Sequence, residues 1–146
     1  MNKKEICTEV TYIIESKLEK LQELISGTRL SNSETKSSMG DKYETGREML
    51  QQEINKLEIQ AGTLQQMLAV LRRISVAPHS RVQSGSLVET DASLFYISVS
   101  AGEFSFQNRK IFAVSAESPV AKMMTGLQKG DSFELNGIKQ HIRQVF

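Results

Sequence analysis

The sequence predicts an α+β protein in which an N-terminal antiparallel coiled-coil hairpin precedes a small β-rich domain. Two apolar stripes with helical spacing occupy the first half of the chain, and alternating apolar residues with tight-turn signals fill the second half. Composition changes near Ser75, since both prolines and all six phenylalanines lie beyond it. We therefore expect a hairpin over residues 1–75, a linker over 76–80 and a second domain over 81–146.

The more regular stripe predicts the second arm of the hairpin. Its apolar residues alternate between spacings of four and three, which is the pattern that winds helices into a left-handed coiled coil. They are Leu50, Ile54, Leu57, Ala61, Leu64, Leu68 and Leu71.

A similar stripe runs from Val10 to Ile25, and a polar, serine-rich segment over residues 31–40 separates the two. Such a segment does not continue a buried helix face, so we expect the chain to turn there. Two stripes joined by a short break favour an antiparallel hairpin within a monomer. A parallel homodimer through the second helix is the alternative.

The second half predicts strands. Phe95, Ile97 and Val99 alternate with Tyr96 and Ser98, which is typical of a half-buried strand. Further strands are expected around the next two phenylalanines, at 104–106, and over 111–114.

Two local signals place a turn and a short helix among these strands. Asn136-Gly137 is the pair expected in a two-residue hairpin turn. Ser118 before Pro119 supplies a capping serine and a proline at the first helical position. The apolar face of this helix is expected to contain Val120, Met123, Met124 and Leu127.

Composition excludes several classes of protein. The net charge of +1 gives no broad basic surface for nonspecific duplex binding. Cys7 is the single cysteine, so no internal disulfide or cysteine-rich zinc site is expected. His79 and His141 lack a second ligand at metal spacing, and both are expected to face solvent. No run of about 20 apolar residues occurs, so we expect a cytoplasmic protein with no membrane partner.

Asp41 and Glu44 lie three residues apart where the hairpin is expected to turn. They resemble a capping box, in which Asp41 accepts amides of the second helix and Glu44 reaches back. The same spacing lets both carboxylates face one cation, and oxygen ligands suit Mg²⁺. The two interpretations are compatible, and the second describes a half-site that a partner completes.

Two motifs resemble those of the bacterial GreA/GreB transcript-cleavage factors. Residues 40–46 (Gly-Asp-Lys-Tyr-Glu-Thr-Gly) are similar to the family's tip, in which Gly-Asp, two variable residues and Glu precede Asn-Ala. Residues 118–126 (Ser-Pro-Val-Ala-Lys-Met-Met-Thr-Gly), followed by Gly130-Asp131, are similar to its Ser-Pro helix and Gly-Asp turn. The resemblance extends over nearly the whole chain.

The resemblance implies an FKBP-like second domain that docks on RNA polymerase beside its secondary channel, while the coiled coil enters the channel. It implies that Asp41 and Glu44 act catalytically by holding Mg²⁺ shared with the polymerase active site, with none bound by the isolated chain. It further implies that the chain contacts the RNA 3′ end only within the polymerase complex. The chain itself is no enzyme but stimulates intrinsic cleavage of backtracked RNA. Polymerase binding is expected to involve Ser118, Pro119, Lys122, Gly126 and Asp131.

The tip departs from the family pattern. Thr45-Gly46 replaces Asn-Ala, Arg47 stands where a further acid is common, and Glu48 replaces an aromatic residue. These changes keep open a regulator of the same channel that binds polymerase without promoting cleavage. A peptidyl-prolyl isomerase is a third, weaker hypothesis, because the pocket aromatics of active isomerases are not recognisable.

Overall fold

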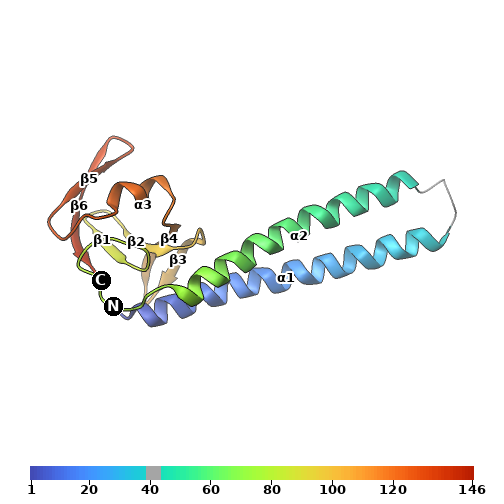
Figure 1. Cartoon of the computed structure of the whole chain (residues 1–146), viewed down its shortest axis with the longest axis horizontal. Helices are drawn as coiled ribbons and strands as arrows, with labels where there is room; N and C mark the ends of the chain where they lie inside the picture. The colour runs from blue at the N-terminus through green and yellow to red at the C-terminus, as the bar shows by residue number, and fades with distance from the viewer. Residues whose placement is uncertain (39–43) are drawn as a thin grey trace. The chain divides into compact units, whose positions relative to one another are not determined.

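The computed structural model describes the backbone of residues 1–38 and 44–146 and the side chains of residues 1–32 and 45–146. In chain order its elements are α1 Lys3–Ser38, α2 Glu44–Arg73, β1 Leu87–Thr90, β2 Leu94–Ser98, β3 Gly102–Phe106, β4 Arg109–Ser115, α3 Pro119–Met124, β5 Ser132–Leu135 and β6 Ile138–Val145 (Figure 1). The predicted α+β class, with a helical hairpin before a β-rich part, is confirmed. Two compact units result: Ile14–Leu68 forms one, and Met1–Ile13 with Ala69–Phe146 forms the other.

The helical unit is an antiparallel pair. Arg29 of α1 pairs with Glu58 of α2, and Ile25 packs with Leu57 and Ala61 in a shared core. The predicted seam of α2 is confirmed, because five of its seven residues are buried and Leu50 and Leu64 are half-buried. The heptad spacing therefore does describe how this helix meets its partner.

The first helix is longer than the sequence predicted. We expected a break over residues 31–40, but α1 continues through Ser38. The segment 31–38 contains neither glycine nor proline, the two residues that most strongly oppose a helix. A polar, serine-rich stretch therefore did not mark the end of this helix.

The six strands form one mixed sheet in the order β3-β4-β2-β1-β6-β5. Neighbouring strands are antiparallel except β2 and β4, which run parallel with Phe95 opposite Phe112. The predicted turn between β5 and β6 is confirmed. Asn136 and Gly137 adopt φ values of 53° and 78°, as a tight two-residue hairpin requires.

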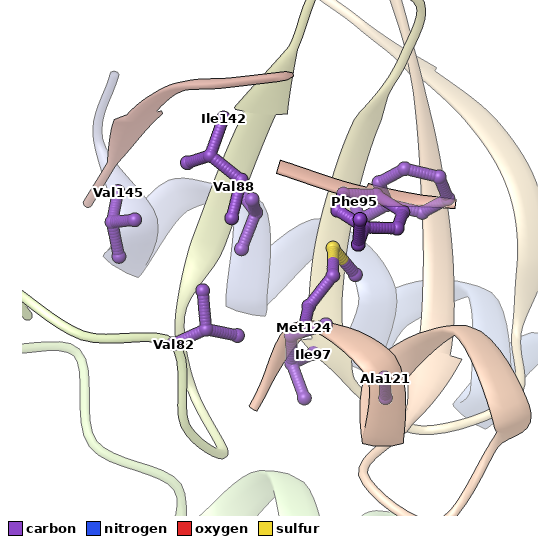
Figure 2. Close-up of a cluster of buried hydrophobic side chains, with 9 residues drawn as sticks. Val82, Val88, Phe95, Ile97, Ala121, Met124, Ile142 and Val145 are labelled. Carbon is purple, nitrogen blue, oxygen red and sulfur yellow. The ribbon is translucent and has the colours of Figure 1, made fainter. Parts of the chain in front are cut away.

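One face of the sheet carries the main hydrophobic cluster, which α3 covers (Figure 2). The rings of Phe95 and Phe112 lie 5.9 Å apart between centroids at its edge. Its buried members are Val82, Val88, Phe95, Ile97, Ala121, Met124, Phe133, Ile142 and Val145.

The other face of the sheet is also covered, so β2 is buried along its whole length. Tyr96 is fully buried there, and its phenol lies beside Cys7 of α1. The Lys3 ammonium donates to the carbonyls of Gly85 at 2.9 Å and Phe146 at 3.1 Å. Figure 2 shows the start of α1 behind the strands, opposite α3. The prediction that this strand is half-buried is wrong, because the first turns of α1 belong to the sheet unit.

Within the described residues, no helix has the length and apolarity needed to cross a bilayer.

Candidate functional site

The expected turn of the hairpin is only partly described. Asp41 lies outside the described residues, and Glu44 is placed by its backbone alone, at the start of α2. The capping and metal-binding interpretations of this pair both stay predictions. Further along the first turn, a Cβ at Gly46 would meet nothing within 4 Å, so packing does not require glycine there.

The predicted docking segment, residues 118–131, starts with the expected helix cap. Ser118 has extended backbone angles (φ −63°, ψ 152°), and its hydroxyl accepts from the Ala121 amide at 3.3 Å. The same hydroxyl donates to the carbonyl of Ser115 at 2.7 Å. Pro119 follows in the first helical turn. The cap is confirmed, and the Ser118 side chain is engaged within the fold.

The end of α3 is tied to the segment that precedes the sheet. Gly126 has a φ of +84°, a conformation that favours glycine, and its amide donates to the carbonyl of Val82 at 2.9 Å. The Arg81 guanidinium donates to the carbonyl of Gly126 at 2.9 Å. Asp131 then closes the next turn, because its carboxylate accepts from the Gln128 amide at 2.9 Å.

The structure therefore divides the five predicted docking residues by role. Ser118, Gly126 and Asp131 fix the course of the backbone, whereas Pro119 and Lys122 are exposed. Pro119 and Lys122 therefore have the most exposed side chains of this set. All five belong to one continuous surface segment.

Sequence analysis missed one exposed residue of this segment. Met123 was expected in the core, but its side chain is 47% exposed, while Ala121 and Met124 are buried. Ala121 and Met124 are three residues apart and therefore share one face of the helix, which could have shown that Met123 lies beside the buried stripe. An exposed methionine next to Lys122 makes the surface of α3 more apolar than predicted.

A second polar cluster lies near the base of the hairpin. His79 was expected to face solvent, but it is half-buried, and its Nδ1 lies 2.9 Å from the Ser86 hydroxyl. Burial and the nearby charge of Lys3 lower the pKa of His79, and burial lowers the pKa of Lys3 itself. Because Ser86 is fully buried and also accepts from the Gln83 amide at 2.9 Å, this cluster is structural.

Other polar groups at the end of α2 and beside it also have structural explanations. Arg72 and Arg73 end α2, where positive charge suits the helix dipole, and Arg73 Nε donates to the carbonyl of Ala69 at 3.3 Å. The Cys7 thiol lies 3.7 Å from the carbonyl of Leu71. In the part of the chain that the structure describes, no group of three or more His, Cys, Asp or Glu side chains could hold a metal ion.

Comparison with known proteins gives only distant likenesses. No family model matches the chain, and no curated protein matches it. Similar solved structures include the transcription factor Gfh1, at 18% identity over 92% of both chains with a TM-score of 0.39. GreA factor homolog 1 (Gfh1) of Thermus thermophilus matches at 18% identity over 93% of this chain and 94% of that chain, with a TM-score of 0.40.

Gfh1 of Thermus aquaticus matches at 20% identity over 94% of each chain, with a TM-score of 0.37. At such identities and TM-scores the likeness carries no functional inference for this chain.

Proposed function

We propose that this chain is a Gre-type transcription factor that binds RNA polymerase and stimulates cleavage of backtracked transcripts. The observation that supports it best is the ordered segment at residues 118–131. There the Ser-Pro helix, the glycine that ends it and the Gly-Asp turn form one continuous surface, in the order that the family resemblance implies. The antiparallel hairpin, with the Gly-Asp-x-x-Glu motif between its arms, supports the same proposal.

In this proposal the docking surface is the exposed side of α3, with Lys122, Met123 and Pro119 in contact with polymerase. Exposed apolar side chains beside a cation are suited to a protein interface. Ser118, Gly126 and Asp131 act by holding this surface in place.

The hairpin carries Asp41 and Glu44 into the secondary channel, where the two carboxylates supply oxygen ligands and orient water toward the scissile phosphodiester. Asp41 and Glu44 would hold Mg²⁺ there together with the polymerase's own ligands, and the bound ion would supply charge stabilisation for phosphodiester cleavage. The chain contributes two carboxylates to a metal site whose other ligands belong to the polymerase.

A transcript-shortening assay tests the proposal. Wild-type protein with Mg²⁺ is added to purified polymerase halted in a backtracked complex, beside Asp41→Asn and Glu44→Gln. Glu53→Gln is the matched control, because it removes an exposed carboxylate from α2 away from the turn. Wild type and Glu53→Gln should accelerate cleavage, and the two tip variants should not. Equal acceleration by all four proteins would contradict the assigned roles.

Docking is measured separately, by co-sedimentation with polymerase. Lys122→Glu and Met123→Ser should weaken binding, and Lys139→Glu, an exposed charge reversal in β6, should not. Ser118→Ala is less informative, since losing the cap disturbs α3 itself.

The runner-up is a channel regulator that binds polymerase without promoting cleavage. It is favoured by Arg47, which lies three residues after Glu44 on α2 and replaces an acid of the family pattern. Binding without acceleration in the two assays would select this function.

A further inference from the structure

The middle of the hairpin has an open groove of about 530 Å³ between α1 and α2. All its lining residues belong to the helical unit. They are Lys17, Lys20, Leu21, Leu24, Gln60, Thr63 and Leu64.

The floor of this groove is apolar and incompletely covered. Leu24 is 53% exposed, whereas Leu21 and Leu64 are half-buried. Leu21 also packs against the internal cluster of the hairpin, so the groove continues that core outward. Exposed leucines that adjoin a core are places where one more apolar segment can be added.

The charge of the groove is one-sided. Lys17 and Lys20 lie on one face of α1, while Gln60 and Thr63 of α2 are neutral. Among the described residues, neither lysine forms an ion pair. No acidic residue lines the groove. Two exposed cations therefore flank leucines that are only partly covered.

The groove on another side of the hairpin differs in both respects. It is lined largely by polar and small residues, and its cation, Arg29, is already paired with Glu58. The combination of exposed leucine and unpaired lysine thus belongs to the first groove and does not follow merely from pairing two helices.

We propose that the groove lined by Leu21, Leu24 and Leu64 binds an acidic amphipathic helix of a partner protein. Two antiparallel helices present a groove whose ridges accept a third helix, and Lys17 to Leu24 span two turns, or about 10 Å. A helix with apolar residues at i, i+3 or i+4 would cover the leucines. Carboxylates beside that stripe would meet Lys17 and Lys20. This binding does not depend on the proposed polymerase function.

The test uses the full-length protein and a fluorescent synthetic helix of about 14 residues, or four turns. The probe has a leucine stripe flanked by glutamates. A second peptide replaces these glutamates with lysines. Fluorescence anisotropy should show the acidic peptide binding at least about tenfold more tightly than the basic one, with a preference that shrinks as salt is added.

Matched variants locate the binding. Leu24→Ser should weaken binding of the acidic peptide by about tenfold, whereas Ile59→Ser should not, because Ile59 is 72% exposed but lies outside the groove. Reversing both lysines (Lys17→Glu with Lys20→Glu) should reverse the preference between peptides. Lys139→Glu is the charge control. Circular dichroism verifies that each variant is helical.

Three results would overturn the proposal. The acidic peptide could fail to bind, both peptides could bind equally, or Leu24→Ser and Ile59→Ser could have equal effects. Sedimentation supplies a further check. If the protein dimerises and Leu24→Ser abolishes the dimer, a second copy of this chain is the occupant, which also contradicts an acidic partner helix.

Discussion

Lys3 makes two hydrogen bonds that the neighbouring sequence does not predict. Its side chain is 5% exposed, and the ammonium bonds to carbonyls 82 and 143 residues away. In the sequence it belongs to a short basic N-terminus with no obvious role. Only the fold brings the carbonyls of Gly85 and Phe146 together beneath it, so no sequence pattern could have identified this residue.

We predict that Lys3→Met lowers the free energy of unfolding by about 2 kcal/mol, because the buried Gly85 carbonyl and the partly buried Phe146 carbonyl lose a charged donor. Methionine retains an unbranched side chain, so lost packing contributes little. Urea unfolding measures the change. Lys4→Met is the control, since Lys4 is exposed, and it should leave the midpoint nearly unchanged. Equal effects of the two substitutions would contradict the role given to these bonds.

His79 makes stability depend on pH. Burial and Lys3 lower its pKa in the folded chain below the ordinary value of 6.5. As pH falls through 6.5, the unfolded chain binds the proton first, so protonation favours unfolding. The stability contributed by neutral His79 is complete above this value and is lost as pH falls toward the lowered pKa.

Urea midpoints of wild type should therefore decrease more between about pH 7.5 and about pH 5.5 than those of His79→Gln, which cannot titrate. Parallel pH profiles of the two proteins would show that another group is responsible.

At the scale of single elements, the sequence predicts those features that depend on residues close together in the chain. The α2 seam, the Ser118 cap and the Asn136-Gly137 turn are confirmed because spacing, capping and a positive φ act within a few residues. The errors concern burial. β2 looked half-buried, and Met123 looked like a core residue, because what covers a face depends on elements distant in the chain.

Two glycines differ in whether the structure leaves room for a side chain. Gly62 lies within α2, where an added Cβ meets nothing within 4 Å. Gly85 has a φ of +92°, and a Cβ there would lie 2.6 Å from the carbonyl of Ser75. We predict that Gly62→Ala stabilises the chain by up to about 1 kcal/mol and that Gly85→Ala destabilises it.

Thermal unfolding of both alanine variants beside wild type measures these opposite shifts. A drop in melting temperature for Gly62→Ala would mean that the helix depends on glycine at this position for a reason other than space.

For the whole molecule, the order of a hairpin followed by a β-rich part was predictable, because helical and strand periodicities occupy different halves of the chain. The candidate site was predictable only in part. Residues 118–131 carry local capping and turn signals that the structure contains. The prediction for the tip acids stays untested, since Asp41 lies outside the described residues. The metal site proposed for them would also need ligands from another protein.

Because the sheet unit is built from two separate chain segments, it predicts how fragments of the protein should behave. This unit includes Met1–Ile13, where Ile6 and Val10 are fully buried. A fragment of residues 76–146 should therefore unfold more readily than a chain with a shortened hairpin, in which residues 1–17 and 64–146 are joined by a short glycine-rich turn. Lys17 and Leu64 line the same groove, so a short turn can join them.

Circular dichroism melts of the two shortened proteins decide the matter. Equal melting temperatures would show that the start of α1 contributes nothing to the sheet, which would also weaken the interpretation of Lys3.

The pairing of β1 with β6 has a consequence for the order of events during translation. The hairpin is complete as soon as residues up to about 73 leave the ribosome, because its two helices are consecutive in the chain. The sheet must wait, because β6 is an interior strand and follows the other five strands in the chain. Until then the edge of β1 that pairs with β6 lacks its neighbour, so the nascent chain is exposed to aggregation and chaperone capture until β6 emerges.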